Sequence, residues 1–176
     1  MAFISTGVEY GLHCLLFLVK QGGLNASPGS RDLADLQGIP AEFTAKLFTK
    51  MQKAGLVETS EGLRGGIRLA RDPSKITVHD VVLAIDGERA MFECREIREN
   101  CAIFDGTAPS WATAGVCSIH AVMLEAERAM RASLSKTTLA DLANAVSRKA
   151  PKAYARDISG WLEERVNARK QPETRN

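Results

Sequence analysis

The hydrophobic pattern of residues 30–70 constrains the fold of this chain more than any other feature. Two stretches, SRDLADLQG and IPAEFTAKLFTKMQKAGLV, space their apolar residues as helices do. The period then changes, because LVETSEGLRGGIRLA has the pattern of two short strands around a glycine-rich turn. A further helix, predicted from about Thr6 to Lys20, precedes all of these segments. Helix, short helix, turn, helix and β-wing follow one another in the order of a winged helix-turn-helix, so we expect a mainly α fold with a small β-wing.

Local signals indicate where these helices begin and end. Ser30 is the expected N-cap of the short helix, and Gly38 is its expected C-terminal stop. Pro40 suits the first turn of the next helix, and Gly55 suits its end. The break between the two helices is therefore short, as a helix-turn-helix requires.

The second half of the chain is predicted to be helical after an irregular segment. A helix is expected from about Thr77 to Ile85, and no convincing periodicity follows from Glu88 to Val116. A long amphipathic helix is expected from Ser118 to Leu134, and another begins with Thr137 or Thr138 as its cap. The tail after Arg148 is basic and polar, and DISGWLEERVNAR can form one more short helix.

These patterns predict four parts. They are a winged helix-turn-helix DNA-binding domain (1–87), a cysteine-containing cluster loop (88–117), a dimerisation helix with the helix after it (118–147), and a basic polar tail (148–176). The long helix cannot bury its apolar stripe on so small a domain alone. We therefore expect a homodimer.

Composition limits the function only weakly. A chain of 176 residues can form one domain with a real core, and a net charge of +2 permits nucleic-acid binding without arguing for it. The longest apolar run, Leu12 to Val19, is too short to span a bilayer, and no signal peptide is recognisable. The expectation is a cytoplasmic protein that does not associate with membranes.

Basic side chains gather on the two elements that a winged helix presents to DNA. Lys46, Lys50 and Lys53 lie on one face of the second helix of the motif. Arg64 and Arg68 lie in and just after the glycine turn of the wing. Lysines alone would indicate an ordinary solvated helix face, but helix and wing together favour binding to double-stranded DNA.

The cysteines suggest a metal site or a redox site. Cys94, Cys101 and Cys117 fall in one segment, and His120 follows three residues after the last. Thiolates bind iron–sulfur clusters or zinc, and imidazole can complete either site. The alternative is three structural or incidental thiols, with Cys101 as a third ligand, a spare or a redox partner.

Glu9 and His13 are polar residues in an otherwise apolar helix. Their i, i+4 spacing places them on the same helix face, so both can reach one metal ion. The alternative is local, because Thr6-x-x-Glu9 is a capping-box pattern. His13 would then be a helix-pair partner of Glu9 or a core histidine. Cys14 points away from His13 and is expected in the core.

The chain resembles the Rrf2 family of bacterial winged-helix regulators, of the IscR and NsrR type, and most closely RsrR-like members. The resemblance covers about residues 1–147. It is carried by GVEYGLHCLLFLV, KMQKAGLV, GLRGGIRLA, ITVHDVVLAIDG, CSIH and TTLADL. It implies a homodimeric transcription regulator rather than an enzyme, whose DNA affinity an iron–sulfur cluster controls in response to redox state, nitric oxide or iron–sulfur status.

The resemblance also implies which residues read DNA. The base-reading positions at the start of the recognition helix fall on residues 42–46, of which we take Glu42, Phe43, Thr44, Ala45 and Lys46 as candidates. The family often has arginine before the first glycine of the wing, where this chain has Glu61, so Arg64 or Arg68 is expected to make the wing contact.

RsrR-like members use an acidic residue and a histidine in the first helix to complete a two-iron cluster. By that resemblance a [2Fe–2S] cluster would be held by Glu9 and His13 of one subunit and Cys94 and Cys117 of the other, with Cys101 as a further candidate and His120 in reserve. The alternatives are a [4Fe–4S] cluster, a cluster-free thiol sensor, or a structural zinc site using the three loop cysteines and His120.

Overall fold

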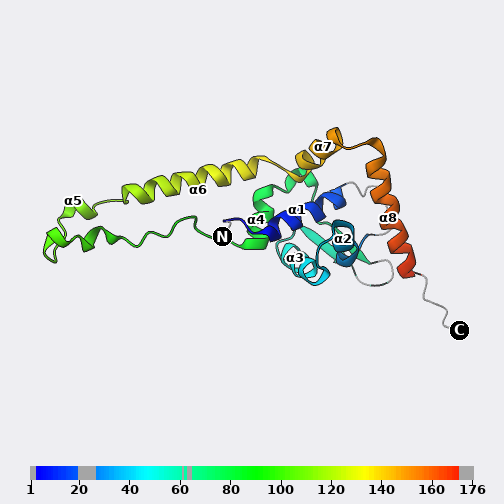
Figure 1. The fold of residues 1–176 in the computed structure, drawn as a ribbon, viewed down its shortest axis with the longest axis horizontal. Helices are drawn as coiled ribbons and strands as arrows, with labels where there is room; N and C mark the ends of the chain where they lie inside the picture. Colours follow the sequence, from blue (N-terminus) through cyan, green and yellow to red (C-terminus); the bar gives the residue numbers. More distant parts are fainter. Residues whose placement is uncertain (1–2, 20–26, 61, 63–64, 171–176) are drawn as a thin grey trace. The chain divides into compact units, whose positions relative to one another are not determined.

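The computed structural model describes residues 3–19, 27–60, 62 and 65–170 of the protein (Figure 1). The chain divides into two compact units, one of residues 1–87 with 134–176 and one of residues 88–133. Within the described residues, no helix is both long and apolar enough to cross a membrane.

The larger unit contains the predicted winged helix-turn-helix. Its elements in chain order are α1 (Thr6–Val19), α2 (Ser30–Gln37), α3 (Ala41–Lys53), β1 (Val57–Ser60), β2 (Gly66–Leu69), a 3₁₀ turn η1 (Pro73–Lys75) and α4 (Val78–Asp86). The strands pair antiparallel, with Val57 opposite Leu69 and Ser60 opposite Gly66. The predicted mainly α fold with a small β-wing is confirmed.

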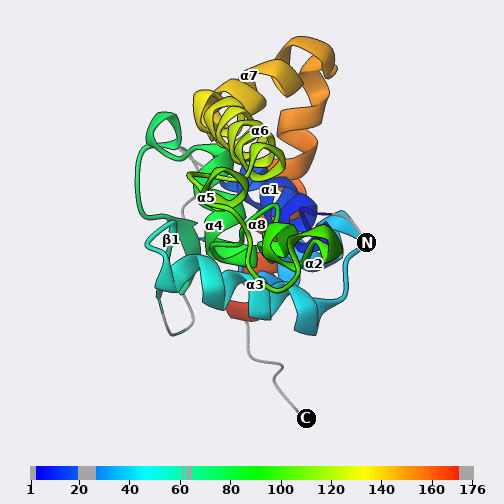
Figure 2. The same ribbon diagram turned by 90° about the vertical axis from the view of Figure 1, so that its left-hand side faces the viewer.

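Helix α1 is the central element of this unit. It contacts α2, α3, α4, β2 and α7 (Leu139–Lys149), and it lies in the middle of the unit in both views (Figures 1 and 2). Gly11 permits the close contact with α4, because a Cβ atom there would lie 2.5 Å from Cδ1 of Ile85. A larger residue would push the two helices apart.

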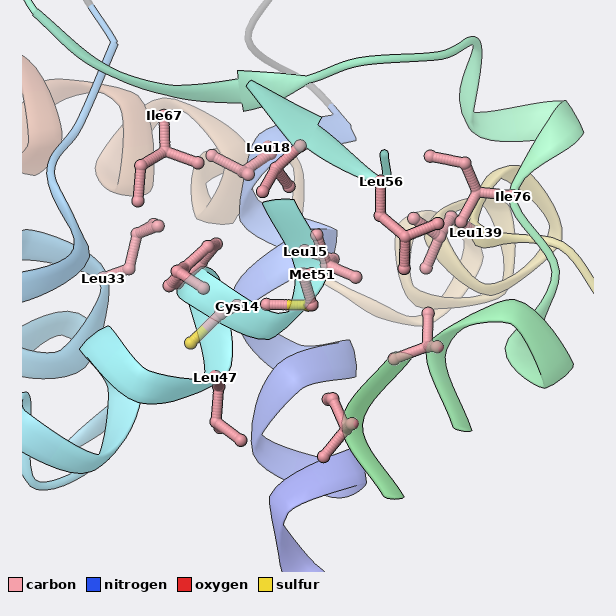
Figure 3. Close-up of a cluster of buried hydrophobic side chains, with 14 of the residues drawn as sticks. Cys14, Leu15, Leu18, Leu33, Leu47, Met51, Leu56, Ile67, Ile76 and Leu139 are labelled. Atoms are coloured by element: carbon pink, nitrogen blue, oxygen red, sulfur yellow. The ribbon is translucent and has the colours of Figure 1, made fainter. Parts of the chain in front are cut away.

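The core forms where α1, α3, the wing and α7 meet. Its fully buried members include Leu15, Met51, Leu56, Ile76 and Leu139 (Figure 3). They come from segments far apart in the sequence, so the core joins the first and last thirds of the chain. Burial of this kind stabilises each side chain by about 1.5–3 kcal/mol relative to exposure to water.

Most predicted helix ends are confirmed, and one is wrong. Gly38 ends α2 in the left-handed conformation with φ of 70°. Thr138 is the N-cap of α7, and its hydroxyl accepts from the backbone N–H of Asp141. Ser30, however, is the first residue of α2 rather than its cap. The cap position is Gly29, whose N–H donates to the carboxylate of Asp32 at 2.8 Å. The helix therefore begins one residue earlier than the sequence predicts.

The smaller unit has little core of its own. It contains η2 (Ile97–Asn100), η3 (Ala102–Phe104), α5 (Ser110–Thr113) and most of the long helix α6 (Ser118–Lys136). Helix α6, all of which the structure describes, buries none of its side chains. Ile119 and Val122 are 64% and 65% exposed. Part of the predicted apolar stripe is therefore exposed, while Met123, Met130 and Leu134 are half-buried.

The tail differs from the short helix that the sequence predicts. Residues Lys152–Lys170 form a 19-residue helix, α8. Leu162 and Val166 are buried, and Leu162 belongs to the core of the larger unit. The guanidinium of Arg169 pairs with the buried carboxylate of Asp32 on α2 at 2.8 Å. Because these contacts involve residues far away in the sequence, the local pattern predicts a helix that is too short.

We predict that Leu162→Ala lowers the free energy of unfolding by about 2–5 kcal/mol, because it removes a buried side chain and leaves a cavity. Equilibrium urea denaturation of the full chain measures this change. Glu163→Ala, at the exposed neighbouring position, is the matched control and should change stability by less than about 0.5 kcal/mol. Equal effects of the two substitutions would show that α8 is no part of the core.

Candidate functional site

The outer face of α3 presents several of the predicted DNA-reading residues to solvent. Glu42, Phe43, Ala45 and Lys46 are all exposed. The ring of Phe43 packs edge-on against Tyr10 of α1, with 5.9 Å between ring centroids. The first turns of the recognition helix are thus open to a ligand while Phe43 is held in place from behind.

Two other predicted residues have structural contacts. Thr44 is fully buried, and its hydroxyl donates to the carbonyl oxygen of Pro40 at 3.0 Å, so it cannot reach a base and the prediction for Thr44 is corrected. The ammonium of Lys50 donates to the carbonyl oxygen of Ile85 at 2.6 Å, near the C-terminal end of α4. Lys50 therefore fixes α3 against α4, where a cation also complements the helix dipole.

The wing is fixed to the segment before α2. The N–H of Ile67 donates to the carbonyl oxygen of Pro28 at 2.8 Å, and a Cβ on Gly66 would lie 2.0 Å from the carbonyl oxygen of Ser27. Only glycine fits at this approach. Arg68 is exposed and forms a salt bridge across the strands with Glu58 at 2.7 Å. Arg64 and Glu61, which the sequence analysis singled out, lie outside the described residues.

In the smaller unit, Arg98 lies close to two of the predicted ligands. The electrostatic influence of both Cys117 and Cys94 contributes to a raised pKa of Arg98, after the hydrogen bond that it donates to Glu96. Its guanidinium also donates to the carbonyl oxygens of Thr113 and Gly115, at 3.3 and 3.1 Å. Arg98 thus links the segment after Cys94 to the segment before Cys117. Neither periodicity nor a motif marks Arg98 in the sequence, so the sequence does not predict these contacts.

The surroundings of Cys117 favour the thiolate form of its side chain. It immediately precedes α6, and the backbone N–H groups of His120 and Ile119 lower the pKa of its thiol, with a further contribution from Arg98. This is the expected effect of a helix N-terminus on a cysteine. The ring of His120 lies 5.9 Å from that of Phe92, and Cys101 is exposed.

The described residues of one chain do not form a complete metal site. Among the described residues, no three His, Cys, Asp or Glu side chains gather where they could hold a metal ion. The structure brings Cys94 and Cys117 into one neighbourhood, and their unit would have to draw further ligands from elsewhere.

Glu9 and His13 lie on the outer face of α1, and both are exposed. They line an apolar groove of about 670 Å³ together with residues of α1, α4 and α7, among them Leu12, Val82 and Leu142. The exposure of His13 contradicts its alternative role as a core histidine.

The capping alternative for Glu9 is also not what the structure shows. Thr6 is already the first residue of α1, and the residue before it, Ser5, is held by Asp86, whose carboxylate accepts from the Ser5 N–H at 2.9 Å. With Thr6 inside the helix, Glu9 is not at the capping-box position. Cys14, by contrast, is fully buried as predicted, and burial raises its pKa to about 12.

A helix-turn-helix with an exposed recognition helix and a β-wing defines a winged-helix transcription regulator. Residues 4–145 match the sequence model of the Rrf2 family, described as iron-dependent transcriptional regulators. The chain therefore belongs to the Rrf2 family, which confirms the resemblance found in the sequence and the expectation that the protein is not an enzyme.

Named relatives agree with this assignment. The protein rrf2 of Nitratidesulfovibrio vulgaris is 34% identical over 140 residues, covering 79% of this chain and 85% of the relative. The HTH-type transcriptional regulator NsrR of Bacillus subtilis is 30% identical over 138 residues, covering 76% and 85%. In structure, CymR, the global cysteine regulator of B. subtilis, matches with a TM-score of 0.63 and 24% identity, over 82% of this chain and 98% of that one. This last match shows the shared fold.

We predict that Cys117 of the metal-free protein is alkylated by iodoacetamide with a midpoint below the ordinary pKa of a cysteine, because backbone N–H groups and Arg98 stabilise its thiolate. Mass spectrometry of alkylation against pH measures this midpoint, and Arg98→Gln should raise it. Buried Cys14 should remain unmodified in the native protein. An unchanged midpoint in Arg98→Gln would contradict the contribution assigned to Arg98.

Proposed function

We propose that the protein is a homodimeric regulator that binds a double-stranded DNA operator and whose affinity is controlled by an iron–sulfur cluster, most simply [2Fe–2S]. Glu9 and His13 of one subunit and Cys94 and Cys117 of the other would hold the cluster. The observation that carries the proposal is the convergence of Cys94 and Cys117 on Arg98, with a lowered thiol pKa at Cys117.

The surfaces of the two units support a dimer. Helix α6 presents Ile119 and Val122 to solvent, and the groove beside Glu9 and His13 is lined mostly by apolar residues. Exposed apolar surface of this kind marks an interaction site. In a homodimer, α6 of one subunit would lie in the groove of the other subunit. One symmetric association would then cover both the groove and the exposed apolar residues of α6.

The donor set suits a two-iron cluster. Two thiolates with one imidazole and one carboxylate place less negative charge at the site than four thiolates do, which raises its reduction potential and couples it to protonation. When bound, the cluster would supply one-electron redox chemistry. Cys101 and His120 remain further candidate ligands in the smaller unit.

The fold offers a route from these ligands to DNA. Glu9 and His13 belong to α1, which packs against α3, and Tyr10 of α1 contacts Phe43 on the recognition helix. A change in ligation at Glu9 or His13 would therefore bear on the helix that reads the operator. Redox state, nitric oxide or iron–sulfur status in the cytoplasm are the signals that such a site can sense.

A cluster-free thiol regulator is the second candidate function. The lowered pKa of Cys117 and the exposure of Cys101 favour it, because thiolate character and access govern oxidation. The structural likeness to CymR, a cysteine regulator by name, is in keeping with it. A zinc site made of Cys94, Cys101, Cys117 and His120 has less support, since no three such side chains gather within the described residues.

We predict that protein purified without oxygen carries iron and absorbs visible light. Glu9→Ala and His13→Ala should each change the absorption spectrum and shorten the lifetime of the cluster, because each removes a ligand. Glu125→Ala, at an exposed position of α6, is the control and should leave the spectrum unchanged. Protein that stays colourless and iron-free after reconstitution would refute the cluster and favour the thiol regulator.

We predict that Lys46→Ala weakens DNA binding and reduces the slope of log affinity against log salt concentration by about 1, because it removes one cation that faces the DNA. Fluorescence anisotropy with operator DNA at several salt concentrations measures this slope. Lys136→Ala, in the last turn of α6, is the charge-matched control. Equal changes of the slope in both variants would show that the DNA does not contact Lys46 specifically.

A further inference from the structure

A second hollow, next to the groove beside Glu9, lies between α1, α7 and α8. It encloses about 230 Å³ and is lined mostly by apolar side chains. Phe17, Val146, Tyr154 and Ile158 are among its walls, and Leu162 is a buried lining residue. Helix α8 is needed to form it, and α8 lies beyond the residues that match the family.

Small side chains create this space. Ala143 of α7 and Ala155 and Ser159 of α8 line the hollow, where larger residues would fill it. Two of the lining residues, Leu162 and Ala143, are buried, at 1% and 5% exposed, whereas Val146 and Tyr154 are 39% and 43% exposed. The hollow therefore extends from the buried core to the solvent.

The lining defines the chemistry of an occupant. None of the described lining residues is Asp, Glu, Lys or Arg, which disfavours a charged ligand. Phe17 and Tyr154 offer aromatic surfaces, and Gln37 and His13 offer hydrogen-bonding groups. The hydroxyl of Ser159 donates to the carbonyl oxygen of Ala155 at 3.0 Å, and its oxygen can still accept.

We propose that this hollow, the α8 pocket, is a binding site for a small neutral molecule with one or two aromatic ring systems and a single hydrogen-bonding group. Sites of this type are apolar clefts with few polar groups that fix orientation. This proposal rests on the geometry of the pocket and not on the proposed cluster. His13 lines both the α8 pocket and the groove, so an occupant would contact a residue that we propose as a cluster ligand.

Titration of the full-length protein with the neutral probe N-phenyl-1-naphthylamine tests the α8 pocket. We expect saturable fluorescence enhancement in the natural sequence and at least a tenfold weaker affinity in Ala155→Phe, whose ring fills the space. Ala168→Phe places the same ring at an exposed position of the same helix and should bind within twofold of the natural sequence. Thermal denaturation establishes that each variant is folded.

Chemical-shift mapping by NMR gives a second readout on the natural sequence, which holds even if Ala155→Phe does not fold. Probe-induced shifts concentrated at Tyr154, Ala155 and Ile158, which line the α8 pocket and not the groove, would support the α8 pocket. Absence of saturable binding, unchanged affinity in a folded Ala155→Phe, or shifts confined to Ile119 and Val122 of α6 would each overturn it.

Discussion

The burial of one face of α1 is the constraint on which the rest of the larger unit depends. Val8, Leu15 and Leu18 fill the core, and Gly11 lets α4 approach closely. Because a helix repeats every 3.6 residues, burying this face leaves the face that carries Glu9 and His13 in solvent. The same helix therefore holds the recognition helix in place and presents the two side chains that we propose as ligands.

The smaller unit depends on a different constraint, because few of its apolar side chains are covered by other residues of the unit. Helix α6 buries none of its side chains, so hydrophobic burial within one chain contributes little to keeping it in place. Polar contacts organise the loop instead. Arg98 joins the segments that carry Cys94 and Cys117, while the start of α6 stabilises the Cys117 thiolate. A unit of this kind is suited to completion by a second subunit.

Helix α8 lies beyond the residues that match the family and packs as part of the larger unit. The buried carboxylate of Asp32 pairs with both Arg165 and Arg169, and it also caps α2. Asp32 is buried whereas Arg165 and Arg169 are partly exposed, so each guanidinium supplies part of the compensation that the buried carboxylate needs. These ion pairs and the burial of Leu162 attach the tail to the helix-turn-helix, and the same docking produces the α8 pocket.

The sequence by itself determined the order of α1 to α4 with the two strands, and of α6 and α7, because hydrophobic period and capping residues act over a few neighbours. It did not predict α5, which lies in the segment without periodicity. It also indicated the loop cysteines and the Glu9–His13 pair. Only the tertiary structure decided that Thr44 faces the core, that Arg98 joins the cysteine segments, and that α8 is a core helix. These outcomes depend on contacts between residues far apart in the chain, and local patterns carry no record of such contacts.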